Sequence, residues 1–438
     1  MPELRKALTR FDLTMIAIGS SIGSGIFLTP SSIAGDLPSS AAVLSVWVLG
    51  GLTALAGALT FAELGGMMPR AGGMYIYLCE AYGGLTGFLF GWAYFLVVNT
   101  GGIAALSVAF ATYTRTFVDL SPTGFSLVAV AGLLVVTVLN ILGVKVGGVF
   151  SDIFTVLKLL GIATLIVVGF GWGSTAGFSF GSMTGGAAGG FATAMVGVLW
   201  SYGGWQHASF TAGEAKDAAR TVPFAMVVGA LTVMIVYLLT NVAYMLLLSR
   251  AAIASSERVA ADAIGAVLGP AGGVLIAAAI IISVYGTTGI YTLTAPRIYY
   301  AMAADGVFFR GVAALHPRFR TPALAIGLQT CWAIVLILYW GTFANLISYV
   351  VFTDWIFFGL TAASVFVLRR KLPQAERPYK TLGYPLTPLF FLSVAAWFVM
   401  NTLLHQPAQA VAGLVFLALG VPVYYVWRRR NAATNVHP

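Results

Sequence analysis

A charge-free run over residues 13–35 combines a length that can cross a membrane with small residues that can unwind a helix. Its middle carries Gly19, Ser20, Ser21, Gly23, Ser24 and Gly25. Glycine costs about 1 kcal/mol relative to alanine inside a helix. Unwound backbone at that depth needs polar partners, because an unsatisfied amide or carbonyl is costly in hydrocarbon. A half-helix restarting at Gly25 would present N–H groups to an anion, and the carbonyls that end the first half would face a cation. An amino acid zwitterion carries both charges.

A second glycine-rich interruption lies in residues 197–206, where Gly203 and Gly204 fall near the middle of the expected sixth membrane span. It comes five spans after the first interruption. Because five is odd, a second five-helix unit starting there would enter the membrane from the opposite side. Interrupted helices at matching positions of two inverted halves mark the binding site of secondary transporters. The alternative is close packing alone, since small residues are common where membrane helices meet.

Lys158 and Asp354 are the ionisable residues most clearly inside expected membrane helices. Such a residue costs at least about 2.5–3.5 kcal/mol at the membrane centre, so a functional role is the first hypothesis. Lys158 could instead extend its long side chain back to the cytoplasmic surface. Asp354 could lie beside a binding pocket and attract an ammonium group, or could make a structural hydrogen bond between helices.

The elements that position these residues are those of an all-α polytopic membrane protein. Of the 438 residues, 59% are hydrophobic and 8% are charged, which leaves too little polar surface for a soluble globule. Apolar runs near the roughly 20 residues that a spanning helix needs predict twelve spans. The expected spans are residues 13–34, 39–66, 81–114, 123–145, 150–171, 190–213, 221–248, 268–302, 322–339, 342–368, 384–404 and 409–427.

We expect one transporter domain over residues 1–438. Within it, the first inverted repeat is expected over residues 13–171 and the second over 190–368, followed by two extra helices over 384–427.

The charge distribution predicts the orientation of the chain in the membrane. An even number of spans puts both termini on one side, and most Lys and Arg residues fall on that side. By the positive-inside rule this side is cytoplasmic, which predicts a multi-pass protein of the plasma or inner membrane. The net charge of +9 therefore reports topology and contact with the lipid bilayer, and no nucleic-acid partner is expected.

Residue groups for enzyme, metal or cofactor chemistry are missing from the sequence. Cys79 and Cys331 lie far apart and predict no disulfide, and the four histidines lack metal-ligand spacing. There is no phosphate loop or nucleophile elbow, so we expect no enzymatic activity, no cofactor and no metal. Charged residues at cytoplasmic helix ends are expected to form ion pairs that either gate transport or anchor the helices: Glu63, Arg70, Glu80, Glu214, Lys216 and Arg220.

Four motifs resemble those of the amino acid–polyamine–organocation superfamily, and most closely those of bacterial relatives of its L-type amino acid transporter branch. They occupy residues 19–30, 62–75, 200–223 and 297–322, in the family's order. The resemblance implies a LeuT-type fold, in which two inverted five-helix repeats bring broken helices 1 and 6 together at the centre. It also implies a small-molecule amino acid as the substrate.

The resemblance further implies roles for individual residues. The amides of Gly23, Ser24 and Gly25, with the Ser24 hydroxyl, would hold the substrate carboxylate. The substrate ammonium would bind carbonyls near Ser21, Trp200 and Gly203, with Trp200 as the aromatic gate. Neighbouring wall residues would be Ile22, Ser201, Tyr202, Gln206, Tyr291 and Asp354. For the aromatic residues, packing is the alternative.

The resemblance also implies that Lys158 occupies the place that a sodium ion fills in sodium-coupled members of the superfamily. A fixed ammonium there would tie the fifth helix to the first and eighth and would exclude sodium. Whether Lys158 also carries a transported proton stays open.

Together these features predict a sodium-independent secondary transporter of neutral L-amino acids that works by exchange or by proton symport. The alternatives are a cationic amino acid or polyamine carrier of the same fold and an amino acid sensor that moves no substrate. The mammalian branch pairs with a heavy subunit through a cysteine after the third helix. The corresponding loop, residues 115–123, has no cysteine, so no disulfide-linked partner is expected. The sequence leaves the oligomeric state open.

Overall fold

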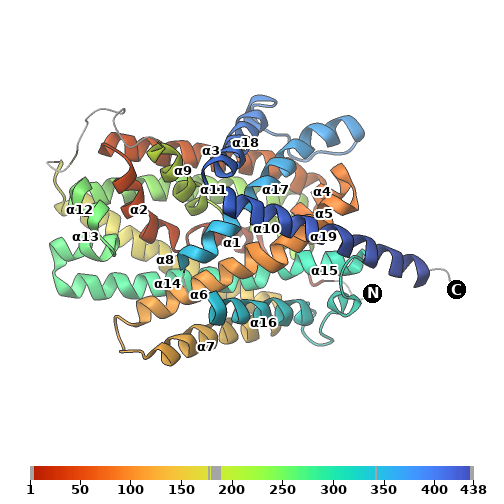
Figure 1. The fold of residues 1–438 in the computed structure, drawn as a ribbon, viewed down its shortest axis with the longest axis horizontal. Coiled ribbons are helices and arrows are strands. Elements are labelled where there is room, and N and C mark those ends of the chain that lie inside the picture. Colours follow the sequence, from red (N-terminus) through yellow and green to blue (C-terminus); the bar gives the residue numbers. More distant parts are fainter. Residues whose placement is uncertain (1–3, 176–177, 179–188, 341–342, 435–438) are drawn as a thin grey trace.

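The computed structural model describes residues 4–175, 178, 189–340 and 343–434, and these residues form helices joined by turns (Figure 1). The first half contains α1 (Arg10–Ser21), α2 (Gly25–Asp36), α3 (Ser40–Met67), α4 (Met74–Tyr82), α5 (Gly84–Ala93), the π-helix η1 (Tyr94–Val98), α6 (Asn99–Thr114), α7 (Pro122–Ile141) and α8 (Val144–Trp172). The second half begins with α9 (Gly190–Ser201), α10 (His207–Phe210), the 3₁₀ helix η3 (Ala212–Glu214), α11 (Ala218–Leu247), α12 (Arg250–Ser255) and α13 (Val259–Leu268). It continues with α14 (Pro270–Thr294), α15 (Pro296–Ala304), the 3₁₀ helix η4 (Arg310–Ala313), α16 (Ala323–Trp340), α17 (Phe343–Lys371), α18 (Leu386–His405) and α19 (Pro407–Thr434).

Ten helical segments of the described residues are long and apolar enough to cross a membrane, which confirms a polytopic membrane protein. Two further predicted spans, residues 190–213 and 322–339, coincide with the shorter apolar helices α9 and α16. The twelve-span arrangement and its inverted repeat therefore stay predictions. Helix α16 ends at Trp340, and the second residue of the break expected at residues 340–341 lies outside the described part of the chain.

Helix α8 shows how membrane helices reverse the pattern of a soluble helix. One of its faces buries Ser151, Thr155 and Lys158, which recur at helical spacing and pack toward α1 and α14. The opposite face exposes large apolar side chains such as Leu160, which is 59% exposed, and Val167, which is 63% exposed. Hydrocarbon is the solvent for the apolar face, so the polar face lies inside the protein.

Both interruptions that the sequence predicts are present. The first span stops at Ser21 and restarts at Gly25, and the second interrupted helix stops at Ser201 and resumes at His207. Helices α1 and α10 contact each other and lie near the centre of the molecule in Figure 1. The two interruptions are therefore neighbours in space. About 180 residues of sequence separate Ser20 from Gly204, yet the Ser20 hydroxyl is hydrogen-bonded to the Gly204 carbonyl oxygen.

Gly204 makes this close approach possible. Its φ of +128° lies in the region that favours glycine, and an added Cβ would come 2.5 Å from the Ser20 carbonyl carbon and from the Ser21 nitrogen. The Ser20 hydroxyl donates to the Gly204 carbonyl oxygen at 2.8 Å. Any side chain at residue 204 would push the two unwound segments apart.

The third span, expected over residues 81–114, is a membrane-length helical segment over Gly84–Thr114. It begins at Gly84, and a π-helical segment, η1, separates α5 from α6. A π-helical insertion changes which side chains face the protein interior after it. Tyr94 and Asn99, at the two ends of this change, are both buried.

Candidate functional site

The start of α2 presents a group of unpaired hydrogen-bond donors. Ser24 is the N-cap residue, and its carbonyl oxygen accepts from the N–H groups of Phe27 and Leu28. Within the described residues, the N–H groups of Ser24, Gly25 and Ile26 find no protein acceptor, as expected for the first turn of a helix. The Ser24 hydroxyl is also buried without a hydrogen-bond partner. These donors and the positive end of the helix dipole form an anion-binding group.

A small cavity lies against these donors and is lined by both interruptions. Among the residues expected at the site it brings together Ser21, Gly23, Ser24, Gly25, Trp200, Ser201, Gly203 and Tyr291. Thr287 and Leu106 complete part of the wall. Two segments far apart in the sequence therefore enclose one small space.

Lys158 lies directly behind this cavity. Its side-chain nitrogen donates to the carbonyl oxygens of Gly19 and Ile22 and to the Thr287 hydroxyl, each at 2.8 Å, and the residue is 1% exposed. The Ser283 hydroxyl donates toward the Ile22 carbonyl oxygen at 3.2 Å. The ammonium thus occupies the carbonyl-rich end of α1 and joins α8 to α1 and α14. This position does not fit the alternative of a side chain extended to the surface.

A second small cavity adjoins the first, and Trp200, Gly203 and Tyr291 line both. Its other walls include Gln206 and Asp354, which were expected at the site. The Gln206 side-chain oxygen accepts from the Gly204 N–H at 2.9 Å, so this side chain also holds the second interruption in shape.

Two buried acceptors in the second cavity have no hydrogen-bond partner among the described residues. They are Asp354 Oδ1 and Asn99 Oδ1. The Asn99 amide nitrogen donates to Gln329 at 3.0 Å, which fixes the direction of its oxygen. A group that donates hydrogen bonds would satisfy both acceptors.

Tyr202 and Ile22 differ from their expected places in the pocket wall, because they line neither of these two cavities. The Tyr202 hydroxyl donates to the Trp47 carbonyl oxygen at 3.1 Å, and its ring packs against Trp47 and Tyr237. Ile22 is fully buried and contributes its carbonyl oxygen to Lys158. Both residues support the wall from behind.

Several residues at the site were not predicted. The Tyr237 hydroxyl lies 2.8 Å from the Ser21 carbonyl oxygen and 3.1 Å from that of Ser201, so it bridges the two interruptions. Tyr94, which was also not predicted, lines the second cavity together with His207, and the His207 ring stacks on Tyr291 with centroids 4.3 Å apart. An amide inside an apolar run is a signal that could have identified Asn99. A tyrosine on a long apolar helix carries no comparable signal.

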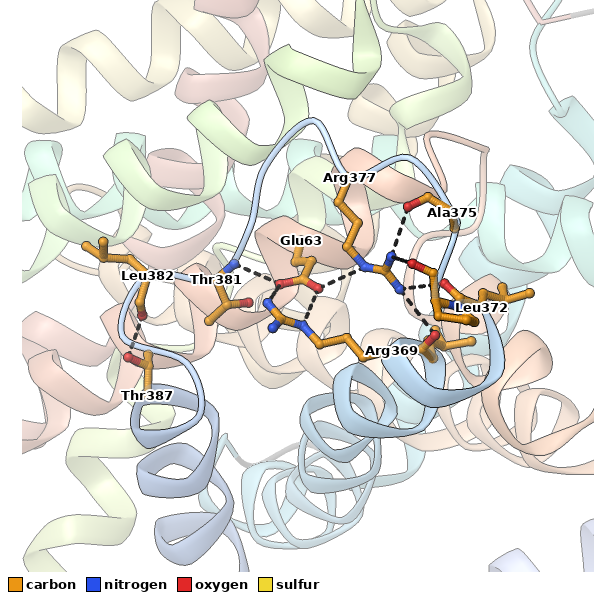
Figure 2. A network of polar contacts seen from close by, with 10 residues as sticks. Glu63, Arg369, Leu372, Ala375, Arg377, Thr381, Leu382 and Thr387 are labelled. Carbon is orange, nitrogen blue, oxygen red and sulfur yellow. Dashed lines mark hydrogen bonds and ion pairs between the residues drawn. The ribbon is translucent and has the colours of Figure 1, made fainter.

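Ion pairs join helices at the face of the protein that carries the N-terminus. Figure 2 shows the Glu63 carboxylate between Arg369 and Arg377, with the Thr381 N–H on a third side. Arg369 binds both carboxylate oxygens, at 2.9 and 2.7 Å, and the Arg377 Nε lies 3.3 Å from one of them. This network joins α3 to α17 and to the segment that leads to α18.

The other residues that were expected to form ion pairs differ in burial: Glu214 is buried, and Arg70 and Glu80 are exposed. Arg297 binds Glu214 through two contacts of 2.6 and 2.8 Å, and both side chains are fully buried. Arg70 and Glu80 form a pair of 2.7 Å on the surface. Within the described residues, Lys216 and Arg220 take part in no ion pair.

No group of three or more His, Cys, Asp or Glu side chains that could hold a metal ion occurs in the described parts of the chain. The candidate site is built from backbone groups, hydroxyls, amides and one lysine.

Interrupted helices that enclose a small polar space inside a polytopic membrane protein are typical of secondary transporters. Comparison with known proteins gives the family: residues 8–426 match the model of the amino acid permease family, and the chain belongs to that family within the amino acid–polyamine–organocation superfamily.

Three curated relatives align over nearly the whole chain. The serine/threonine exchanger SteT of Bacillus subtilis (strain 168) is 32% identical over 431 residues, which cover 97% of this chain and 97% of SteT. The mouse (Mus musculus) large neutral amino acids transporter small subunit 2 is 30% identical and covers 99% of this chain and 83% of its own length. The mouse b(0,+)-type amino acid transporter 1 is 30% identical, with 98% and 90% covered. These relatives are transporters by name.

Proposed function

We propose that the protein exchanges neutral L-amino acids across the cell membrane without sodium. The observation that carries this proposal is the placement of Lys158. Its ammonium already binds the Gly19 and Ile22 carbonyl oxygens at 2.8 Å, beside a cavity that neighbouring donors make suitable for a carboxylate. A sodium ion would need the same carbonyl oxygens. The fixed positive charge therefore replaces the ion.

The substrate carboxylate would accept hydrogen bonds from the Ser24, Gly25 and Ile26 amides and from the Ser24 hydroxyl. These donors are unpaired within the described chain, so binding an anion satisfies them without breaking an existing bond. The substrate ammonium would bind carbonyl oxygens where the interruptions end, near Ser21 and Trp200. Trp200 lines both cavities, and its ring would close over the bound substrate.

The substrate side chain would enter the second cavity. Its aromatic and amide lining carries no net charge apart from Asp354, which supports a neutral side chain. The two unpaired acceptors, on Asp354 and Asn99, favour a side chain that can donate hydrogen bonds. The relative SteT is named as a serine/threonine exchanger, and the hydroxyl side chains of serine and threonine fit that chemistry.

A cationic amino acid is the second candidate substrate, and Asp354 is the observation that favours it. A carboxylate in the side-chain cavity could pair with the extra positive charge of such a substrate. Proton symport is the alternative coupling mechanism. Symport requires a group that binds and releases the transported proton, whereas exchange requires no such group.

The remaining proposals concern the arrangement in the membrane. The chain would place both termini in the cytoplasm, because the basic residues gather at that face. The two interrupted helices would lie at matching positions of two inverted repeats, residues 13–171 and 190–368, and rocking of one helix group against the other would alternate access. The protein would work without a disulfide-linked heavy subunit, because residues 115–123 contain no cysteine.

Counterflow in proteoliposomes tests the proposal. Purified protein is reconstituted in sodium-free buffer, and uptake of labelled neutral and cationic amino acids is measured with and without unlabelled amino acid inside. Uptake of neutral amino acids only into loaded vesicles is the expected result. Uptake into empty vesicles driven by an inward proton gradient would instead show symport. Preferred uptake of cationic amino acids would support the second candidate, and binding without uptake would contradict transport.

A further inference from the structure

A basic cavity of about 500 Å³, open to solvent, lies on the face that carries the N-terminus, and the residues that line it are separate from those of the candidate substrate site. Arg5 ahead of α1, Lys145 in the first turn of α8 and Arg318 in the loop before α16 all line it. Within the described chain, none of these three side chains forms an ion pair with a carboxylate. Three exposed basic residues therefore line one space and have no ion-pair partner among the described residues.

The loop that carries Arg318 is held in place by several hydrogen bonds. The Thr321 hydroxyl donates to the Ile141 carbonyl oxygen at 2.8 Å, which fixes the loop against the end of α7. The His316 N–H donates to the Thr321 carbonyl oxygen at 2.8 Å and closes the loop. The His316 ring nitrogen Nδ1 accepts from the Arg318 N–H at 3.3 Å. The backbone of Arg318 is thus positioned beside the cavity by the fold.

The start of α8 adds backbone donors to the same cavity. Gly143 precedes the helix with a φ of +146°, and no side chain caps it. The first helical bond runs from the Gly147 N–H to the Gly143 carbonyl oxygen, so the amides of the first three helical residues have no intrahelical acceptor. Such a helix start supports an anion that the three basic side chains attract.

The remaining wall of the cavity is apolar and continues onto the lipid-facing side of α8. Leu142 is 41% exposed and Val149 is 47% exposed, and both line the cavity. Ile153, one helical turn beyond Val149, is 52% exposed. A ligand with an anionic head and an apolar tail fits this pair of surfaces, whereas a free anion would leave the apolar wall without a partner.

We propose that this cavity binds the phosphate group of an anionic phospholipid, with its acyl chains lying along the exposed apolar face of α8. Basic pockets between membrane helices on the basic side of a membrane protein suit such headgroups. The site is independent of the proposed substrate and of the coupling mechanism.

Native mass spectrometry of the full-length protein in detergent tests this proposal, with phosphatidylglycerol as the probe. The test variant combines Arg5→Gln, Lys145→Gln and Arg318→Gln. The matched control combines Lys380→Gln, Arg428→Gln and Arg429→Gln, which removes three positive charges that do not line the cavity. We expect the control to keep the wild-type affinity for the first bound phosphatidylglycerol, and the test variant to bind it about tenfold or more weakly. Phosphatidylcholine should bind all three proteins weakly and equally.

Equal phosphatidylglycerol affinities in the test variant and the control would overturn the proposal. Displacement of the lipid by inorganic phosphate at comparable concentration would also overturn it, since the site would then bind the free anion. The single variant Lys145→Glu is the second test in case the triple variant fails to fold. Lys145 is exposed, and reversing its charge should weaken phosphatidylglycerol binding severalfold while the thermal unfolding midpoint stays unchanged.

Discussion

Replacing Lys158 with methionine tests the basis of the proposed sodium independence. The substitution keeps an unbranched chain and removes an ammonium that makes three hydrogen bonds of 2.8 Å. A hydrogen bond from a charged group contributes about 1.5–3 kcal/mol, so the three together contribute about 4.5–9 kcal/mol before desolvation is counted. Keeping the ammonium out of water costs several kcal/mol. The substitution should therefore remove a net stabilisation of about 2–4 kcal/mol from the native geometry of the first interruption.

The assay is the initial rate of amino acid counterflow in sodium-free proteoliposomes, normalised to the amount of reconstituted protein. Because 1.36 kcal/mol corresponds to a tenfold change, we expect the rate to fall by about 30-fold to 1,000-fold. Lys380→Met is the matched control, since Lys380 is exposed and lies outside the expected membrane spans, and it should keep the wild-type rate. A Lys158→Met protein that transports at the wild-type rate would refute the reasoning.

Three further substitutions test other parts of the structure. Glu214→Gln leaves the fully buried Arg297 without its carboxylate partner and should destabilise the protein by about 3–5 kcal/mol in thermal unfolding. Glu80→Gln on the surface should cost less than about 1 kcal/mol. Equal losses of stability in the two variants would contradict the assigned burial. Gly204→Ala should reduce counterflow at least about tenfold because its Cβ meets backbone at 2.5 Å, whereas Gly83→Ala, also at positive φ but with nothing within 4 Å, should keep most of the rate. Comparable rates in the two glycine variants would argue against a tight crossing of the interruptions. Asp354→Asn should keep neutral amino acid counterflow and lose any uptake of cationic amino acids, and loss of both at normal expression would show that the carboxylate charge is required.

The two interruptions were predictable because their cause is local. Glycine and serine residues inside a charge-free run oppose a continuous helix wherever the chain later packs, and the breaks occur at residues 22–24 and 202–206 as that composition indicates. Lys158 was equally visible as a candidate residue, since a lysine in an apolar span needs a compensating partner. Its binding to α1 and α14 followed from the family resemblance.

The side-chain lining of the cavities was harder to predict because it depends on helix rotation. The π-helical segment Tyr94–Val98 changes which of the neighbouring side chains face the protein interior. Nothing in its apolar sequence indicates the extra residue in the turn. Tyr202 follows α9 at the second interruption, but its ring packs against Trp47 and the residue lines neither of the two substrate-site cavities. Tyr237 reaches the interruptions from α11, and only the packing of that helix against α1 brings its hydroxyl there.

The measurement that tests the central claim most directly is amino acid binding to the purified protein in sodium-free buffer, compared with binding of the methyl ester of the same amino acid. The amino acid is the one that gives the highest counterflow rate. If unpaired amides at the start of α2 bind the carboxylate and Lys158 replaces sodium, the ester should bind at least about tenfold more weakly. Added sodium should then leave the dissociation constant of the free amino acid unchanged. Equal binding of acid and ester, or tighter binding on addition of sodium at constant ionic strength, would contradict the account.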